Sequence, residues 1–220
     1  MTLRSYLSDS AVSGPARIVD KIEADVPIVR LDRTLFHPNT ASQRADRGRI
    51  GMAQVLAVEI NGAVVDHYVD RTDAMSVGGH VEMLVDSSWR CLQSTYHSAG
   101  HLIAYALQEI RSDCTALIGQ HWPDHAVITC YAGRSLNVAD LERVHDQMRD
   151  LIAADLPILA QNRSDARYVT FGDLAPVRCN GTHLVSTGTL SRVHILRHEF
   201  DGEYLRLHYV AYNKPHGGKE

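Results

Sequence analysis

The hydrophobic pattern of this chain changes its period near residue 86, and this change constrains the fold more than any other feature. Before that point, short apolar runs alternate with turn residues, and Asn61-Gly62 joins two of the runs. Asn-Gly between such runs is a strong β-hairpin signal, because both residues tolerate a positive φ. Beyond that point, apolar residues recur at helical spacing to about residue 111. We therefore expect a turn-rich β module over residues 1–86 and a different module over residues 87–220.

The second module is expected to combine helices with antiparallel strands. A second amphipathic helix is predicted after Asn137, which is a favourable N-cap. Later apolar segments predict strands, and Asp201-Gly202 predicts a two-residue turn between the last two of them. The strands cluster apart from the helices, which argues against a doubly wound parallel sheet. The expected fold class is α+β.

The sequence also predicts a polar tail over residues 1–16, one strand over residues 26–36 and a loop at the C-terminal end, residues 213–220.

Composition is that of a globular protein, with 45% hydrophobic and 22% charged residues among 220. No apolar run is long enough to span a bilayer, and the first 17 residues do not resemble a secretory signal. We therefore expect a cytoplasmic location and no membrane partner. Four widely spaced cysteines do not suggest a disulfide framework. A formal net charge of −4 argues against a nucleic-acid coat protein, and no DNA partner is expected.

One segment nevertheless has a local excess of arginine over acidic residues. It carries Asp32 and Asp46 together with five arginines: Arg30, Arg33, Arg44, Arg47 and Arg49. These arginines form either a solvated loop or a patch that binds RNA phosphates. Charge alone favours the solvated loop.

Two separated half-sites carry the chemistry. His97 and His101 lie four residues apart in the first predicted helix, so both imidazoles should share one face. A zinc peptidase would have a glutamate directly after the first histidine, but Ser98 is there. Cys179 and His183 lie four apart around an Asn-Gly pair. A set of three histidines and one thiolate suits zinc. Taken singly, each half-site could instead be a polar helix face or a buried thiol beside a loop histidine.

At these residues the chain resembles a known family. The motifs "HSAGH" at 97–101 and "CNGTHLVSTG" at 179–188 resemble the editing domain shared by alanyl- and threonyl-tRNA synthetases, and above all the free-standing AlaX-type editing proteins. The segment "LDRTLFHPNTASQRADRGRIG" at 31–51 resembles the family segment in which a Leu-Asp-x-Thr strand enters a Gly-rich loop ending in Gln. The likeness extends over about residues 26–212.

This resemblance implies a β-barrel-like N-terminal module, followed by an α+β editing domain with an antiparallel sheet and an HxxxH-bearing helix. It implies an enzyme that hydrolyses the ester between a wrong amino acid and the terminal ribose of a tRNA, with aminoacyl-tRNA as partner and one Zn²⁺ per chain. The implied metal ligands and catalytic residues are His97, His101, Cys179 and His183. The implied substrate-binding residues are Thr34, His37, Thr40, Ala41, Ser42, Gln43, Asp46 and Thr182. The implied tRNA-binding residues are the five arginines named above.

The chain departs from the family just before Gln43, where members carry glycines. Here the residues are Thr40, Ala41 and Ser42. The family default is serine or glycine on an alanine tRNA, but added side chains favour a larger acyl group, such as threonine or fluorinated threonine on a threonine tRNA. Two alternatives are a non-catalytic zinc-containing tRNA-binding protein and a zinc hydrolase of small esters. The sequence carries no prediction of the oligomeric state.

Overall fold

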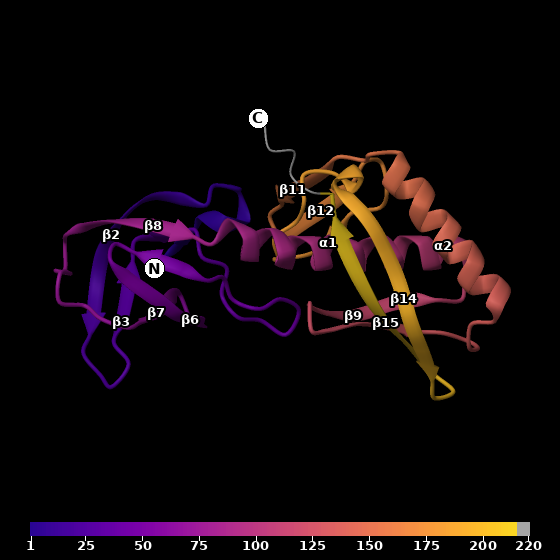
Figure 1. Cartoon of the computed structure of the whole chain (residues 1–220), viewed down its shortest axis with the longest axis horizontal. Helices are drawn as coiled ribbons and strands as arrows, with labels where there is room; N and C mark the ends of the chain where they lie inside the picture. Colours follow the sequence, from indigo (N-terminus) through magenta and orange to yellow (C-terminus); the bar gives the residue numbers. More distant parts are fainter. Residues whose placement is uncertain (215–220) are drawn as a thin grey trace. The chain divides into compact units, whose positions relative to one another are not determined.

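The computed structural model describes residues 1–214 of the chain (Figure 1). The chain divides into two compact units, Met1–Cys91 and Leu92–Glu220, which are described separately. The boundary predicted at residue 86 lies five residues before this division. Strands are mostly antiparallel and the helices are few, so the α+β class is confirmed. No helix in the described part of the chain is both long and apolar enough to cross a membrane.

The first unit is built on a closed barrel with the strand order β2-β3-β7-β6-β5-β8. Each neighbouring pair in the barrel is antiparallel, and closure leaves no free sheet edge. The strands are β2 (Ser13–Ile22), β3 (Ile28–Leu31), β5 (Gly48–Ile50), β6 (Ala53–Asn61), β7 (Val64–Val69) and β8 (His80–Val85).

The barrel interior explains why these segments form strands. Buried and exposed residues alternate along β2 and β6, as expected when one face of a strand meets the core. Phe36, Ile50, Val58 and Met83 are among the fully buried side chains that fill the interior. Each contributes about 1.5–3 kcal/mol by leaving water.

The predicted hairpin is present, but its turn lies one residue later than expected. Asn61 pairs with Val64, so Gly62 and Ala63 form the two-residue connection between β6 and β7. Gly62 has a φ of 58°, which glycine adopts without strain. The strand predicted over residues 26–36 is split into β3 and β4 (Arg33–Thr34).

The prediction of a polar tail over residues 1–16 is wrong. The short strand β1 (Leu3–Arg4) pairs in parallel with β4, and a 3₁₀ turn, η1 (Ser5–Leu7), follows it. The Thr2 hydroxyl donates to the Leu31 carbonyl at 2.9 Å and is buried. These contacts join residues about 30 positions apart, which a local hydrophobic pattern does not reveal.

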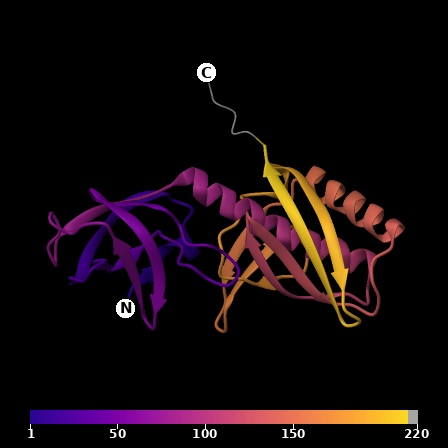
Figure 2. The same cartoon turned by 60° about the horizontal axis from the view of Figure 1, so that its bottom comes forward.

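The described part of the second unit holds two antiparallel sheets, one complete helix and most of another, which begins within the first unit (Figures 1 and 2). The larger sheet has the order β14-β15-β10-β9, and the smaller has the order β11-β12-β13. The strands are β9 (Thr115–Trp122), β10 (His125–Tyr131), β11 (Ile158–Asn162), β12 (Arg167–Phe171), β13 (Val177–Arg178), β14 (Leu190–Phe200) and β15 (Tyr204–Asn213). The helices are α1 (Ser87–Ile110) and α2 (Val138–Ala153), and a 3₁₀ turn, η2 (Thr187–Thr189), precedes β14.

Helix α2 begins as the sequence predicts. The Asn137 side chain accepts a hydrogen bond from the Asp140 N–H at 2.8 Å, and the Asp140 carboxylate accepts from the Asn137 N–H at 3.1 Å. This reciprocal pair is a capping box, which satisfies two backbone donors at the helix start. Val144 and Met148 form part of the buried stripe.

The connection between β14 and β15 is longer than the predicted two residues, because Phe200 pairs with Leu205. Asp201 accepts hydrogen bonds from the N–H groups of Glu203 and Tyr204, which stabilises this wider turn. At the C-terminal end, Asn213 still belongs to β15. Lys214 belongs to no helix or strand, and residues 215–220 of the predicted terminal loop lie outside the described residues.

Candidate metal centre

The two half-sites meet in the second unit. His97 and His101 both lie on α1, and their rings stack with centroids 5.3 Å apart and planes 11° apart. Cys179 and His183 come from the segment that follows β13. One ligand atom from each of the four residues lies within 4.8 Å of every other. The structure therefore brings together side chains that are 78–86 positions apart in sequence.

The separations within this cluster suit a tetrahedral ion. The Cys179 Sγ lies 3.3 Å from the Nε2 atoms of both His97 and His183. With zinc–sulfur and zinc–nitrogen bonds of about 2.3 and 2.0–2.1 Å, tetrahedral ligand atoms lie roughly 3.5 Å apart. The Nε2 atom of His101 is buried and, among the described residues, has no hydrogen-bond partner. A buried ring nitrogen without a partner is unfavourable, and a metal bond would satisfy it.

The electrostatics of the cluster also fit a metal. Burial lowers the pKa of His101 to about 4, so the imidazole is neutral near pH 7 and keeps a lone pair. Burial raises the pKa of the Cys179 thiol, although hydrogen bonding from Gly181 opposes this shift. A thiol in such surroundings becomes a thiolate when a cation binds it. The donor set is thus suited to zinc.

Ser98, which takes the place of a peptidase glutamate, connects the two half-sites. Its hydroxyl oxygen accepts a hydrogen bond from the Leu184 N–H at 3.0 Å and lies 3.4 Å from the Nδ1 of His183. When His183 donates from Nδ1 to this oxygen, its Nε2 is left with the lone pair that a metal requires. Ser98 therefore helps to orient His183, and a hydroxyl is not a strong base.

Arg167 on β12 holds the loop that carries Cys179. Its guanidinium donates to the carbonyls of Cys179 at 2.7 Å and of Gly181 at 3.0 Å. The Cys179 N–H in turn donates to the Arg167 carbonyl at 3.1 Å. These bonds fix the position of the sulfur before any ion binds.

His121 on β9 is a member of the site that sequence reasoning missed. Its ring stacks on His97 with a centroid distance of 4.5 Å. Tyr209 donates its hydroxyl proton to the Tyr96 carbonyl at 2.8 Å, so His121 donates from Nδ1 to the Tyr209 oxygen at 2.7 Å. Burial lowers the pKa of His121 to about 3. The ring of His121 is therefore neutral near pH 7, and it packs against His97.

The sequence feature that could have indicated this contact is a pair of glycines near the His121 ring. A Cβ built on either Gly100 or Gly119 would lie 2.2 Å from the His121 ring. Glycine at both positions leaves room for the imidazole between α1 and β9.

The predicted substrate-binding residues of the first unit are largely engaged in its own hydrogen bonds. The Thr34 hydroxyl bonds the His67 Nε2 at 2.8 Å and is fully buried. The Asp46 carboxylate accepts from the His37 N–H and from the Arg90 guanidinium. The structure therefore gives Thr34 and Asp46 a role within the barrel unit.

The loop that departs from the family also bonds to itself. The Thr40 hydroxyl accepts from the Gln43 N–H at 3.0 Å and donates to the Gln43 carbonyl at 3.1 Å. Gln43 is fully buried, Ser42 is partly buried and Ala41 is exposed. Thr182, which belongs to the second unit, shares a hydrogen bond of 2.8 Å with Ser94 and lies next to His183 in the chain.

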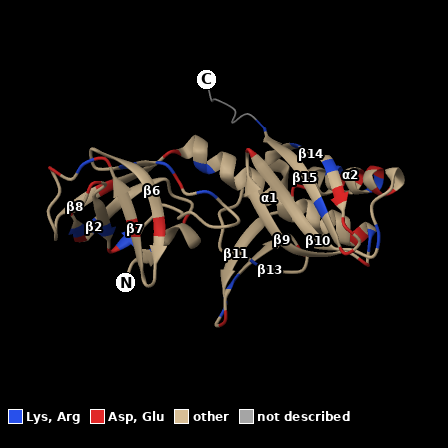
Figure 3. Cartoon of the chain, turned by 90° about the horizontal axis from the view of Figure 1, so that it is seen from below, with Lys and Arg blue, Asp and Glu red and all other residues tan. Residues whose placement is uncertain are grey.

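The five arginines have different surroundings. Arg30 pairs with Asp66 at 2.6 Å and with Asp20 at 2.9 Å, so its charge is balanced. The Arg47 guanidinium lies over the Trp89 ring, 3.5 Å from its centroid. Arg33, Arg47 and Arg49 are exposed. Basic and acidic residues are interspersed over the barrel unit (Figure 3).

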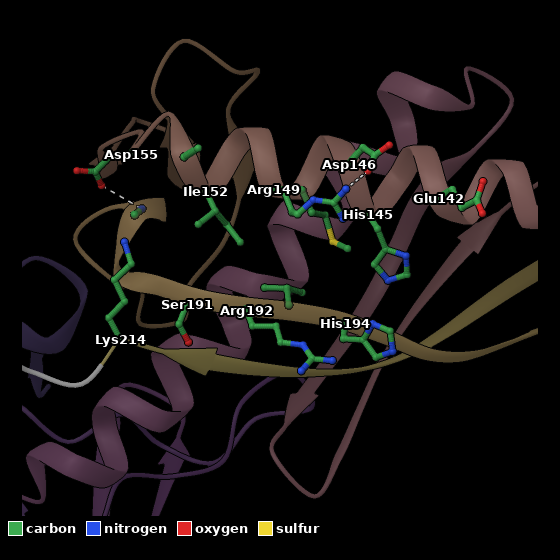
Figure 4. Close-up of a pocket in the computed structure, with 14 residues that line it drawn as sticks. Glu142, His145, Asp146, Arg149, Ile152, Asp155, Ser191, Arg192, His194 and Lys214 are labelled. Carbon is green, nitrogen blue, oxygen red and sulfur yellow. Dashed lines mark hydrogen bonds and ion pairs between the residues drawn. The ribbon is translucent and has the colours of Figure 1, made fainter.

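A groove of about 870 Å³ runs between α2 and β14, and none of the four residues of the His/Cys cluster lines it (Figure 4). Arg149 forms an ion pair with Asp146 there, and His145 and His194 stack with centroids 5.0 Å apart. The His145 Nε2 accepts from the Ile195 N–H at 3.2 Å, so it joins the helix to the strand. These contacts assign a packing role to His145.

Comparison with known proteins supports the resemblance seen in the motifs. No model of a known protein family matches the chain. The alanine–tRNA ligase of Desulfitobacterium hafniense is 26% identical over 215 residues, covering 86% of this chain and 25% of the ligase. The alanine–tRNA ligase of Methanopyrus kandleri is 28% identical over 205 residues, covering 81% of this chain and 22% of the ligase. The alanyl-tRNA editing protein AlaX-L of Pyrococcus horikoshii is 26% identical over 208 residues, covering 83% of this chain and 50% of AlaX-L.

The chain thus spans about a quarter of the ligases' length and half of AlaX-L. The alignments with both kinds of protein cover more than 80% of this chain. Over most of its length, the chain is therefore similar both to a free-standing AlaX-type alanyl-tRNA editing protein and to part of the alanine–tRNA ligases.

Proposed function

We propose that this protein is a zinc-dependent hydrolase that removes a wrong amino acid from tRNA by cleaving its ester bond. The observation that carries the proposal is the buried His₃Cys cluster with its unpartnered His101 Nε2 atom. The similarity to a protein named for alanyl-tRNA editing supplies the substrate class. The partner is aminoacyl-tRNA.

Zinc would be held by His97, His101, Cys179 and His183. When bound, it supplies a Lewis acid that can polarise an ester carbonyl or lower the pKa of water. The hydrogen bonds of Ser98 to His183 and of Arg167 to the Cys179 loop support a role of both residues in positioning two of these ligands. An activated aminoacyl ester is easier to hydrolyse than a peptide, so the absence of a glutamate after His97 is compatible with this chemistry.

The test is a panel of charged tRNAs incubated with zinc-loaded protein. We expect hydrolysis of at least one aminoacyl-tRNA well above its spontaneous rate, loss of this activity with a chelator, and recovery when zinc is returned. Hydrolysis of small activated esters alone would favour the small-ester alternative. Zinc-loaded protein that accelerates none of these reactions would contradict the proposed function.

Acyl choice provides a further prediction. We propose that the Thr40–Ala41–Ser42 loop favours a threonine-like acyl group over serine or glycine. Replacing all three residues with glycine should shift the ratio of kcat/KM toward seryl-tRNA by about 10-fold or more, because a pocket distinguishes one carbon by about 1–3 kcal/mol. The comparison uses seryl- and threonyl-tRNA with both proteins. Thr40→Ser, which keeps the hydroxyl bonded to Gln43, is the control for loop integrity. A native preference for serine on an alanine tRNA would refute the argument.

A second prediction concerns the effect of Arg44 and Arg47 on tRNA affinity. We propose that they contact tRNA phosphates, while Arg30 serves the barrel through its ion pairs. Changing Arg44 and Arg47 to Gln should weaken tRNA binding and reduce the slope of log K against log salt by about 2, since each phosphate contact contributes about 1. The matched control changes Arg197 and Arg206, on the hairpin of β14 and β15, to Gln. Equal slopes for both double variants would assign Arg44 and Arg47 to a solvated loop.

A further inference from the structure

A buried carboxamide on α1 forms no hydrogen bond within the described structure. Gln93 is fully buried, and among the described residues neither its Oε1 nor its Nε2 has a hydrogen-bond partner. Gln93, His97 and His101 are spaced four apart on one helix, so they occupy one stripe of its surface. The stripe therefore joins an unsatisfied amide to two metal ligands.

The neighbouring polar groups of α1 make this amide unusual. Ser94 bonds to Thr182 at 2.8 Å, and Ser98 accepts from the Leu184 N–H at 3.0 Å. Of the side chains on this stripe, the unpartnered atoms belong to Gln93 and to His101. A metal explains the His101 nitrogen. A buried amide left without partners is costly, and such a group is typical of a place where a ligand provides the missing bonds.

The ligand must carry a donor and an acceptor close together, since a carboxamide presents one of each. An aminoacyl ester has this pair: its α-amino group donates, and its carbonyl oxygen, three bonds away from the amino nitrogen, accepts.

We propose that Gln93 binds the aminoacyl end of the substrate, with Oε1 accepting from the α-amino group and Nε2 donating to the acyl carbonyl oxygen. This inference rests on the proposed function and narrows its substrate class to acyl groups with a free α-amino group. A site built to hydrogen-bond an N–H group discriminates strongly against an analogue that lacks it, because its own polar atoms are then left unpaired.

The test measures binding rather than turnover. The probes are two non-hydrolysable adenosines with a 3′-amide in place of the ester, one carrying L-threonyl and the other carrying 3-hydroxybutanoyl, which lacks only the α-amino group. Their affinities for zinc-loaded native protein and for Gln93→Met are compared by calorimetry. Gln108→Met is the matched control, because Gln108 is an exposed residue of the same helix.

We expect native protein to prefer the threonyl probe by at least about 10-fold, which is about 1.4 kcal/mol. Gln93→Met should bind the threonyl probe at least 10-fold more weakly and lose most of that preference. Zinc content should remain unchanged, and the melting temperature should stay equal or rise, because an unpaired buried amide has been removed. Gln108→Met should behave as native protein does.

Equal affinity of native protein and Gln93→Met for the threonyl probe would overturn the inference, as would an equal loss for both probes. A lower melting temperature or lost zinc in both Gln93→Met and Gln93→Leu would also overturn it, since Gln93 would then have a structural role. If native protein deacylates tRNA but Gln93→Met binds the threonyl probe as tightly as native protein does, this inference alone is refuted. Amino-group-dependent binding through Gln93 without any deacylation would refute the proposed function alone.

Discussion

Replacing Cys179 with alanine is expected to reduce zinc from about one ion per chain to a small fraction and to lower the deacylation rate by roughly 10²–10³-fold or more. The three histidines remain, and two of them are still held by α1. The thiolate is lost, and in the native protein its Sγ lies 3.3 Å from two of the other ligand atoms. Even groups that only support a metal ligand affect zinc affinity by about 10–100-fold, so the loss of a ligand should exceed this. Elemental analysis of purified protein measures the effect directly.

The matched control is Cys114→Ala, because Cys114 is a buried cysteine of the same unit that does not belong to the metal cluster. This variant should keep its zinc and lose only some stability through the smaller side chain. Zinc addition at high concentration should partly restore activity to Cys179→Ala if the three histidines still bind weakly. Full zinc retention in both Cys179→Ala and His97→Ala would remove the basis for a zinc centre at these residues.

Replacing Asp46 with alanine is expected to lower the free energy of unfolding of the first unit by about 3–5 kcal/mol. Asp46 accepts two hydrogen bonds from the Arg90 Nε, at 2.9 and 3.0 Å, and another from its Nη2. The Asp46 side chain is completely buried and that of Arg90 is 9% exposed. Without Asp46, the Arg90 guanidinium remains buried without its counter-ion, which is the main origin of the cost.

Urea unfolding followed by tryptophan fluorescence tests this prediction, because Trp89 lies in the first unit and Trp122 in the second. Arg71→Ala is the control, since this exposed partner of Asp70 should contribute about 1 kcal/mol or less. The double variant Asp46→Leu/Arg90→Met should recover part of the loss, because neither charge is then left unpaired. A change below about 1 kcal/mol for Asp46→Ala would show that the ion pair is not what holds this unit together.

This second result also bears on the resemblance, which places Asp46 among the substrate-binding residues. If Asp46→Ala unfolds the first unit, a loss of deacylation in that variant reports on the fold and not on substrate contact. Measurement of kcat/KM at a temperature where both proteins are folded separates the two effects.

The parts of this protein that its sequence determined are those whose signals are local. His97 and His101 fall on one face because four residues are close to one helical turn. The Asn137 cap is a local hydrogen-bond pattern, and so is the turn that follows Asn61. Each depends on residues fewer than about five positions apart, so the pattern is readable along the chain.

The tertiary structure decided what depends on distant pairing. Strand β1 was missed because its partner, β4, lies about 30 residues away, and β9 was missed because its first four residues are all exposed and its sequence shows no apolar alternation. His121 supports His97 through contacts that only folding creates, and Arg30 is balanced by Asp66 from another strand. Gln93 is identified in the same way. Its sequence position predicts only a helix face, whereas packing leaves its amide buried and, among the described residues, without a hydrogen-bond partner. Burial and partner choice arise from non-local contacts, and these cannot be read from local spacing.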